Sequence, residues 1–350
     1  MSDTNKPIRA AVLGASGYTG ADLIRLAARH PAIELTALVA KGHAGQGLAQ
    51  VFPHLASLDL PALVTSDAVD WDKIDVAFGG LPHGTAHSEI AKLPQRVKII
   101  DMSADFRLRD PTLYAEWYAN QHSAPELIGD AVYGLTEHYR DQIKGARLVA
   151  CPGCYPTAVL LALLPLAKAK LIAVDDIIID AKSGVSGAGR TLKQNILFSE
   201  AGEGLSPYGI GNHRHVPEIE QELGLAANGA VTVNFTPHLV PMSRGELCTC
   251  YVRLAGKASA SDLRQALTAA YAKSPFVRIV EDGVIPATQH VRGSNFCHIG
   301  VFADRIADRA IVVSAIDNLV KGSAGQALQN FNLLYGFDET TGLAQLPLFP

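Results

Sequence analysis

The sequence predicts an α/β protein with two domains, a doubly wound parallel sheet followed by an α+β domain with a mixed sheet. Three observations predict this class. Near the N-terminus an apolar run leads into a glycine-rich turn and then a helical pattern; strands and helices alternate to about residue 150; and the remaining half is richer in strand-like runs. The length of 350 residues also favours two domains over one.

The first strand and helix enclose a glycine motif. Residues 8–13 (IRAAVL) are apolar, residues 14–20 read GASGYTG, and residues 21–29 have a helical spacing of apolar residues. A glycine turn between a strand and a helix allows backbone N–H groups and the helix dipole to bind a pyrophosphate. This order of elements therefore predicts a Rossmann-type cofactor domain. The alternative is a tight turn without a ligand. The cofactor residues predicted here are Gly14, Ser16, Gly17, Tyr18, Thr19 and Gly20.

The second strand, residues 34–40, bears on the choice of cofactor. An enzyme that uses NAD usually has an acidic residue at the end of this strand, where it holds the ribose hydroxyls. Glu34 lies at the opposite end, and the strand runs into Lys41. Because a cation suits a 2′-phosphate, Lys41 favours NADP. The alternative is that Lys41 is a solvated loop lysine.

The remaining elements define two domains. Further strands are predicted at 76–78 and 97–100, each followed by a glycine-rich or polar loop at the edge where parallel sheets bind ligands. We expect a cofactor domain of residues 1–150, joined by a C-terminal helical segment of residues 318–350. A catalytic and oligomerisation domain of residues 151–317 would carry strands at 177–180, 230–235, 247–254 and 310–315 and a helix at 258–272.

Cys154 is the predicted nucleophile. It lies in the segment CPGCYPT (151–157), between an apolar strand and a buried helix over 158–169. A thiol at a helix N-terminus has a lowered pKa, and a thiolate near a histidine suits covalent catalysis. Cys151 and Cys154 as a redox pair, or a zinc site that adds Cys248 and Cys250, are weaker alternatives. The glycine-loop pattern does not fit a redox protein, and C-x-C in a strand usually places both cysteines on one face, so no metal is predicted.

Six segments occur in an order that points to a family. They are residues 14–20 (GASGYTG), 81–84 (LPHG), 152–157 (PGCYPT), 183–190 (SGVSGAGR), 213–219 (HRHVPEI) and 318–327 (NLVKGSAGQA). Together they closely resemble the N-acetyl-gamma-glutamyl-phosphate reductases, which are related to the aspartate-semialdehyde dehydrogenases. The resemblance spans nearly the whole chain. It implies reduction of N-acetyl-L-glutamyl 5-phosphate by NADPH to the 5-semialdehyde, with release of phosphate, in arginine biosynthesis, by a homo-oligomer that is a dimer or tetramer.

The resemblance also assigns catalytic residues. The nucleophile of the family falls on Cys154, and the acid/base histidine falls on His213 or His215, of which we favour His215. If this segment is helical, Glu218 lies one turn after His215 and would orient its ring; the alternative is that Glu218 is an acid of the first helical turn, stabilised by the helix dipole. The chain departs from the family after the second strand, where Ala40 and Lys41 replace serine and arginine. Lys41 would then contact the 2′-phosphate.

The substrate implied by the resemblance is anionic at both ends, and arginines bind such groups with two parallel hydrogen bonds. Arg107, Arg190 and Arg214 lie beside the motifs above and are predicted to bind it, with ordinary ion pairs as the alternative. Ser183 and Gly184 begin a glycine-rich loop that is predicted to approach the cofactor. In related dehydrogenases the start of the corresponding helix lies near the nicotinamide, so the resemblance predicts that Asn318 contacts the cofactor. The alternative is that Asn318 caps the helix.

Composition excludes several other classes. Hydrophobic residues make up 48% and charged residues 18%, and the net charge of −4 argues against nucleic acid as a partner. No apolar run reaches membrane-spanning length, the first residues lack a signal-peptide core, and five cysteines form no disulfide scaffold, so a cytoplasmic protein is expected. The remaining alternatives are aspartate-semialdehyde dehydrogenase, a reductase of aminoadipyl or carrier-linked glutamyl phosphate, and a non-catalytic NADP-binding regulator, which would lack the nucleophile or the histidine.

Overall fold

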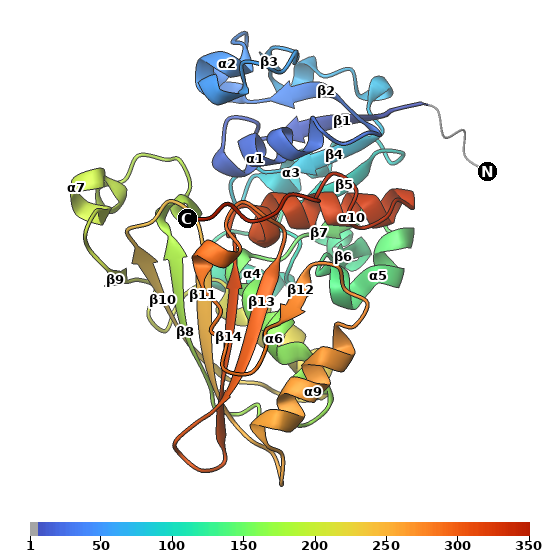
Figure 1. Ribbon diagram of the computed structural model, residues 1–350. Helices are drawn as coiled ribbons and strands as arrows, with labels where there is room; N and C mark the ends of the chain where they lie inside the picture. The colour runs from blue at the N-terminus through green and yellow to red at the C-terminus, as the bar shows by residue number, and fades with distance from the viewer. Residues whose placement is uncertain (1–5) are drawn as a thin grey trace. The chain divides into compact units, whose positions relative to one another are not determined.

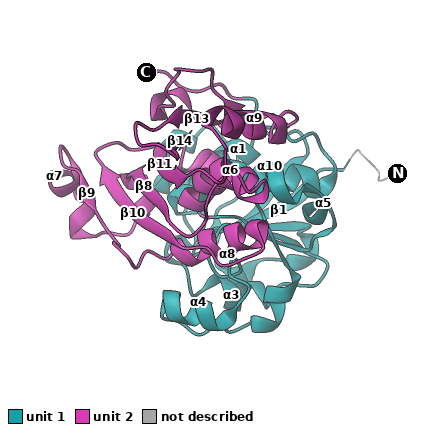
Figure 2. Cartoon of the chain, turned by 90° about the horizontal axis from the view of Figure 1, so that it is seen from below, with its two compact units in different colours: residues 1–152, 323–344 teal, residues 153–322, 345–350 magenta. Residues whose placement is uncertain are grey.

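The computed structural model describes residues 6–350, which form two compact units (Figures 1 and 2). The first unit contains the chain up to Pro152 together with Ser323–Ala344. The second contains Gly153–Gly322 together with Gln345–Pro350. The segment that returns to the first unit is therefore shorter than the range of 318–350 expected from the sequence.

The first unit is built on a parallel sheet of seven strands, which confirms the predicted doubly wound class. Its strands are β1 (Ile8–Leu13), β2 (Ile33–Val39), β3 (Leu63–Val64), β4 (Val76–Gly79), β5 (Lys98–Asp101), β6 (Ala131–Tyr133) and β7 (Leu148–Ala150). They lie in the order β3-β2-β1-β4-β5-β7-β6, and every neighbouring pair is parallel. The strand order reverses between β1 and β4, and the loops at the carboxyl ends of these strands border the ligand crevice of such sheets.

Helices cover both faces of this sheet (Figure 2), which is why its strands are apolar throughout. The helices of the unit are α1 (Tyr18–Ala27), α2 (Leu48–Val51), α3 (Ala86–Ile90), α4 (Pro111–Tyr118), α5 (Thr136–Gly145) and α10 (Gly325–Tyr335). On one face α10 packs beside α1, and the ring of Phe331 lies 5.9 Å from that of Phe78 in β4. On the other face Ile90 of α3 joins a core that includes Leu13 of β1.

The second unit contains a mixed sheet of seven strands, as the sequence predicted. The strands are β8 (Ile177–Gly184), β9 (Ser206–Pro207), β10 (Val233–Val240), β11 (Glu246–Arg253), β12 (Val277–Ile279), β13 (Cys297–Ala303) and β14 (Arg309–Ile316). Their order is β12-β13-β14-β11-β8-β10-β9. The pairs β8–β10 and β12–β13 are parallel and the others are antiparallel. In β8, β10 and β11 buried and less buried residues alternate, so one face of the sheet is covered.

Helices α6 (Cys154–Lys168), α8 (Val216–Ala227) and α9 (Ala260–Ala270) pack on the covered face, and α7 (Phe198–Ala201) lies in a long connection between β8 and β9. Helix α6 contacts β11, β14, α8 and α9. It is buried from Tyr155 to Ala167, which explains why its sequence is apolar all round. This central helix begins at the predicted nucleophile.

The segment after β14 differs from the single helix predicted over 318–334. It is a π-helical turn, Val320–Ala324, followed by α10. One carboxylate oxygen of Asp317 accepts the N–H groups of Leu319 (2.8 Å) and Val320 (3.0 Å). The carbonyl of Asp317 accepts the N–H of Gly322 at 3.0 Å, a bond between residues five apart. Such wide turns are frequent at functional sites.

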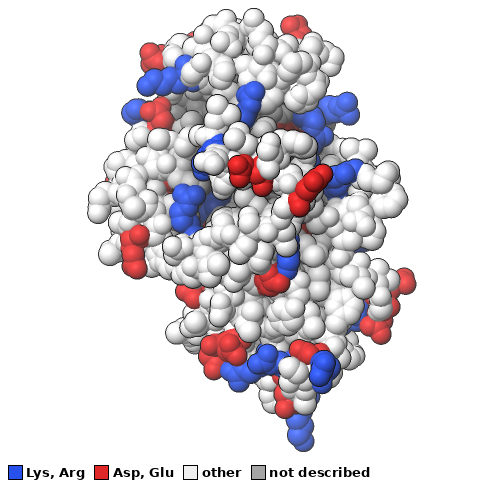
Figure 3. Space-filling model, turned by 90° about the vertical axis from the view of Figure 1, so that its left-hand side faces the viewer, with Lys and Arg blue, Asp and Glu red and all other residues white. Residues whose placement is uncertain are grey.

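The surface carries charges of both signs. On the face drawn in Figure 3, Lys and Arg side chains are interspersed with Asp and Glu, in keeping with the small net charge. Among residues 6–350, no helix has both the length and the apolar character needed to cross a membrane.

Candidate active site

Steric constraints require glycine at two positions of the loop between β1 and α1. Gly14 has a φ of +82°, and a Cβ at this position would lie 2.3 Å from the carbonyl oxygen of Gly80. A Cβ on Gly20 would lie 2.4 Å from the carbonyl oxygen of Gly14. The loop is therefore tight in the way that close approach of a backbone to a phosphate requires.

The start of α1 fits a dinucleotide. Gly17 is its N-cap, and the first helical bond runs from the N–H of Ala21 to the carbonyl of Gly17 at 2.9 Å. The preceding N–H groups belong to the first turn, which has no intrahelical acceptors and binds anions. Ser16 and Thr19 are half-buried and Tyr18 is 38% exposed. The predicted cofactor residues of this loop thus lie together at one helix N-terminus.

Lys41 lies directly after β2 and is exposed, as the first residue of a short 3₁₀ turn. Two acids lie within its electrostatic reach. The pKa of Asp67 is lowered by Thr65 and further by Lys41, and that of Glu89 by Lys92 and further by Lys41. The ammonium group is therefore at the carboxyl edge of the sheet, where the sequence analysis placed it.

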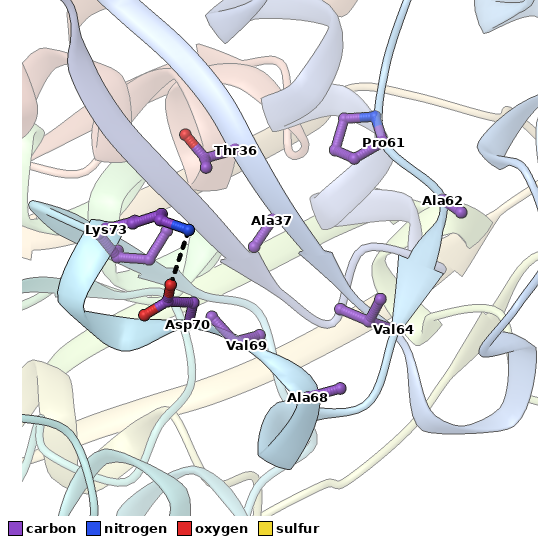
Figure 4. Close-up of a pocket in the computed structure, with 10 residues that line it drawn as sticks. Thr36, Ala37, Pro61, Ala62, Val64, Ala68, Val69, Asp70 and Lys73 are labelled. Carbon is purple, nitrogen blue, oxygen red and sulfur yellow. Dashed lines mark ion pairs between the residues drawn. The ribbon is translucent and has the colours of Figure 1, made fainter.

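A separate pocket of the first unit lies beside β2 and β3 (Figure 4). An ion pair between Lys73 and Asp70, 2.9 Å long, borders it. The other lining residues are Thr36, Ala37, Pro61, Ala62, Val64, Ala68, Val69 and Ile74. None of the residues predicted to be functional lines this pocket, so we do not assign it to the active site.

Cys154 is the first residue of α6, which confirms its predicted place at a helix N-terminus. Gly153 is the N-cap, and its carbonyl accepts both the N–H and the hydroxyl of Thr157 at 2.9 Å. Cys154 is partly exposed, whereas the other four cysteines are buried. Burial raises the pKa of Cys151 to about 12, which makes that thiol a poor nucleophile.

Glu218 fixes the turn in front of the nucleophile. It lies in the first turn of α8, so the segment is helical, as both predicted roles of this acid required. Its fully buried carboxylate accepts the backbone N–H of Gly153 at 2.9 Å. Orientation of His215 by Glu218 stays a prediction. The bond to Gly153 shows that Glu218 also holds the turn that precedes Cys154.

His213 and His215 lie together beside the start of α6. Their rings are 4.8 Å apart, and each is 5.8 Å from the ring of Tyr155. The N–H of His215 donates to Nδ1 of His213 at 3.2 Å. Burial, and then the charge of Arg214, lower the pKa of His213 to about 4. His213 is therefore neutral at neutral pH.

Three residues of this neighbourhood were not found from the sequence. The hydroxyl of Tyr208 donates to that of Tyr155 at 3.2 Å, and burial raises the pKa of both phenols. Glu246, at the start of β11, is fully buried, and burial raises its pKa to about 8. Tyr155 follows the nucleophile directly in the recognised PGCYPT segment, which was the available signal. The signal for Glu246 was an acid on the apolar side of an alternating strand.

The loop after β8 is tied to Asn318. The side-chain oxygen of Asn318 accepts the N–H of Gly245 at 2.9 Å, and its amide donates to the Ser186 hydroxyl at 3.0 Å. A Cβ on Gly184 would lie 2.8 Å from the carbonyl oxygen of Met242. Ser183, Gly184 and Asn318 therefore lie in one loop cluster of the second unit, and their contact with a cofactor stays a prediction.

The three predicted substrate arginines are placed differently from one another. Arg107 is buried in the first unit and donates to the backbone carbonyls of Cys151 (2.8 Å) and Met102 (2.9 Å). Arg190 and Arg214 are exposed in the second unit. Arg214 acts electrostatically on His213 and Tyr208, so it lies nearest to the histidine pair. Binding of substrate by all three stays a prediction.

The zinc alternative finds no support in the geometry. Cys248 and Cys250 lie on the same buried face of β11, as their spacing predicted. Within residues 6–350, no group of three or more His, Cys, Asp or Glu side chains is arranged to hold a metal ion.

The fold is shared with solved semialdehyde dehydrogenases. Aspartate semialdehyde dehydrogenase II from Vibrio cholerae, in complex with ASA, superimposes with a TM-score of 0.70 over 95% of this chain and 99% of that chain, at 16% identity. The aspartate semialdehyde dehydrogenase of Candida albicans with NADP gives a TM-score of 0.69 over 94% of this chain and 99% of that chain, at 18% identity.

Sequence comparison reaches much closer relatives. Residues 9–146 match the family described as semialdehyde dehydrogenase, NAD binding domain, and residues 154–318 match semialdehyde dehydrogenase, dimerisation domain. N-acetyl-gamma-glutamyl-phosphate reductase of Rhodospirillum rubrum is 57% identical over 98% of this chain and 99% of its own length. A probable chloroplastic N-acetyl-gamma-glutamyl-phosphate reductase of Arabidopsis thaliana is 55% identical over 99% of this chain and 86% of its own. The chain therefore belongs to the N-acetyl-gamma-glutamyl-phosphate reductase family of the semialdehyde dehydrogenases.

Proposed function

We propose that this oxidoreductase reduces N-acetyl-L-glutamyl 5-phosphate with NADPH, forming N-acetyl-L-glutamate 5-semialdehyde and phosphate. The observation that carries the proposal is the partly exposed thiol of Cys154 at the N-terminus of α6, with its turn held by Glu218 and two histidines beside it. The names of relatives more than 50% identical support the choice of substrate. The place in arginine biosynthesis follows from that substrate.

The residues of the chain suit attack on an acyl phosphate. The first turn of α6 favours the thiolate of Cys154 and presents N–H groups to the oxygen that becomes negative when the thiolate attacks. Phosphate leaves and a thioester remains on Cys154. The bound nicotinamide cofactor, held by the Gly14–Gly20 loop, would supply the hydride that reduces this thioester. A histidine protonates the tetrahedral oxygen and takes the proton back when the aldehyde forms.

We assign that proton transfer to His215. His213 has a pKa of about 4 and its Nδ1 already accepts the N–H of His215, so at neutral pH it is a neutral imidazole and a weak proton donor. We expect His215→Asn to lower kcat by about 10²- to 10⁴-fold, the usual contribution of a general acid. His213→Asn, the matched control, should lower kcat by less than about tenfold. Steady-state kinetics across pH check this, and a larger loss in the His213 variant would reverse the assignment.

The choice of NADP is tested at Lys41. We expect the unaltered enzyme to prefer NADPH, and Lys41→Asp to raise the KM for NADPH by about tenfold or more, since a charge-assisted bond to the 2′-phosphate becomes a repulsion. The KM for NADH should change little. Lys144→Asp, at another exposed lysine of the same unit, is the control and should affect neither cofactor. Equal use of NADH by the unaltered enzyme would contradict the proposal.

Substrate specificity is tested in the reverse direction. With NADP and inorganic phosphate, we expect kcat/KM for N-acetyl-L-glutamate 5-semialdehyde to exceed that for aspartate semialdehyde by about 10²-fold or more, because buried polar groups reject a substrate that leaves them unpaired. The initial rate of NADPH formation measures both. Preference for aspartate semialdehyde, or for an aminoadipyl or carrier-linked semialdehyde, would overturn the substrate. No turnover with any of them would favour the non-catalytic regulator.

We also propose an oligomeric state and a location for the protein. The match of residues 154–318 to a dimerisation domain supports a homo-oligomer, a dimer or a tetramer. A cytoplasmic location is our proposal for this chain; the similar plant proteins are named chloroplastic.

A further inference from the structure

The turn after β14 is built around one buried acid. Asp317 follows Ile316, the last residue of β14, and its exposed fraction is 0%. One carboxylate oxygen accepts the N–H groups of Leu319 and Val320, and the other accepts the N–H of Gly293 at 2.7 Å. A buried carboxylate is costly unless donors of this kind surround it. These bonds therefore fix the side chain of Asp317 and, with it, the first residues of the turn.

The backbone of the same residue closes the turn. The carbonyl of Asp317 accepts the N–H of Gly322 at 3.0 Å, and this bond between residues five apart belongs to the π-helical segment Val320–Ala324. The first N–H groups of a helical turn lack acceptors within the helix. The carboxylate of Asp317 supplies the acceptor for two of them. The course of the chain from Asp317 to Gly322 thus depends on Asp317 at both ends.

Gly322 packs directly on the predicted nucleophile. A Cβ at this position would lie 2.8 Å from Cβ of Cys154 and 3.2 Å from its Cα. The backbone of Gly322 is therefore in contact with Cys154, and the course of the turn limits where the thiol can lie. Helix α6, which begins at Cys154, also packs against β14, so strand, turn and helix start meet at this point.

The nucleophile is held from two directions. Glu218 accepts the N–H of Gly153, the residue before Cys154, and so fixes the backbone in front of it. The turn after β14 adds a contact at the Cβ of Cys154. Covalent attack requires close alignment of the reacting atoms, and a misplacement of about 1 Å can lower a rate by about 10²-fold. A residue that shapes the turn can therefore control the rate without touching the substrate.

Two neighbours of Asp317 define the alternative roles that a test must separate. Arg244 lies 3.5 Å from the carboxylate, so the charge of Asp317 could be what matters. Asn318 follows Asp317 directly and is predicted to contact the cofactor. Its side chain has anchors of its own, because it accepts the N–H of Gly245 and donates to the hydroxyl of Ser186. Shape, charge and cofactor contact therefore make different predictions for substitutions of Asp317.

We propose that Asp317 is a positioning residue for the reaction, which builds the π-helical turn that seats Gly322 on Cys154 and thereby fixes the thiol for attack. The proposal rests on the proposed function of Cys154. Asp317 takes no part in the making or breaking of bonds. It acts on the nucleophile through the backbone of the turn, by the shape of its hydrogen bonds.

Two substitutions separate the shape of the acceptor from its charge. Asp317→Asn loses the charge but keeps a short side-chain oxygen for the N–H groups of Leu319 and Val320, and asparagine caps a helical turn about as well as aspartate. Asp317→Glu keeps the charge but moves the carboxylate one methylene further along the side chain. We expect kcat of Asp317→Asn to stay within about fivefold of the unaltered enzyme, and kcat of Asp317→Glu to fall by about 10²-fold.

The rates are measured with NADP, inorganic phosphate and N-acetyl-L-glutamate 5-semialdehyde, per folded molecule as counted by circular dichroism. The KM for NADP should change by less than about threefold in both variants, because Asn318 keeps its separate anchors. Asp75→Glu is the matched control. Asp75 also accepts a backbone N–H, that of Arg9 at 3.0 Å, but it lies before β4, at the opposite edge of the first unit's sheet from the glycine loop. It should leave kcat unchanged.

Equal losses of kcat in Asp317→Asn and Asp317→Glu, or no loss in either, would overturn the proposal. A raised KM for NADP with unchanged kcat would also overturn it, because Asp317 would then act through Asn318. If Asp317→Glu does not fold, Asp317→Ala removes the acceptor without adding volume and should show the same loss.

A second readout needs no turnover. The rate constant for alkylation of Cys154 by iodoacetamide should be the same in Asp317→Asn and the unaltered protein, and should change by more than about fivefold in Asp317→Glu, where the thiol leaves its fixed place at the start of α6. An unchanged rate constant in Asp317→Glu overturns the proposal. Failure of the proposed function is distinct, because it would appear as turnover retained by Cys154→Ser.

Discussion

Replacing Cys154 with serine should abolish turnover, lowering kcat by about 10⁴-fold or more, the usual loss when a covalent nucleophile is removed. A serine hydroxyl at a helix N-terminus stays protonated at neutral pH and does not attack the acyl phosphate. The dissociation constant for NADPH, measured by fluorescence titration, should change by less than about threefold, since the glycine loop after β1 is untouched.

Cys151→Ser is the matched control for this prediction. Cys151 is buried, and its sulfur accepts a weak bond from Asn330 at 3.6 Å. We expect the variant to keep kcat within about threefold and to lose some stability, as substitutions of buried residues usually do. A redox pair would need both cysteines, so equal losses in the two variants would restore that alternative. Substantial activity in Cys154→Ser would refute the thioester mechanism.

Glu246→Gln should be more stable than the unaltered protein, and the difference in the free energy of unfolding should grow as the pH rises. The ordinary pKa of a glutamate is 4.5, and burial raises that of Glu246 to about 8. Between these values the unfolded carboxyl has lost its proton while the folded one keeps it, so the free energy of unfolding falls with rising pH by about 1.4 kcal/mol for each pH unit. The total cost approaches about 5 kcal/mol at pH 8 and vanishes below the unfolded pKa.

Urea unfolding of both proteins at pH 5 and pH 8 measures this effect. Glutamine resembles the protonated acid, so the two proteins should have similar stability at pH 5, and the variant should be more stable by several kcal/mol at pH 8. Other groups that titrate in this range, such as the buried Asp101 with a pKa of about 6, are common to both proteins and cancel in the difference. Glu200→Gln, at an exposed position, is the control. A difference that does not depend on pH would contradict the prediction.

Local patterns were sufficient for the first domain. The apolar run of β1, the glycine turn and the spacing of α1 predicted a parallel sheet, and the structure confirms it. The position of Cys154 at the start of α6 was also predictable, because proline and an apolar run mark the beginning of a helix. Several strands were missed. β6 and β12 have three residues each, too few to show a period, and are held by pairing with distant strands. β13, with seven residues, was also not predicted.

The missing parts of the site depend on contacts that sequence spacing does not show. The predicted strand over 247–254 began one residue too late, so Glu246 was left in a loop and its place in the alternation with Cys248 was not recognised. The helix predicted from residue 318 begins as a π-helical turn because Asp317 binds the N–H groups that follow it. Both differences arise from partners that are distant in sequence or from side-chain acceptors, which periodicity cannot reveal.

The close packing of Gly322 on Cys154 has a mechanical consequence. The chain passes from one unit to the other three times, between Pro152 and Gly153, between Gly322 and Ser323, and between Ala344 and Gln345. Cys154 adjoins the first passage in the chain and touches the residue before the second, which has no room for a side chain. A side chain at position 322 would press on the turn that carries the nucleophile, so either Cys154 or the backbone of residue 322 would have to shift.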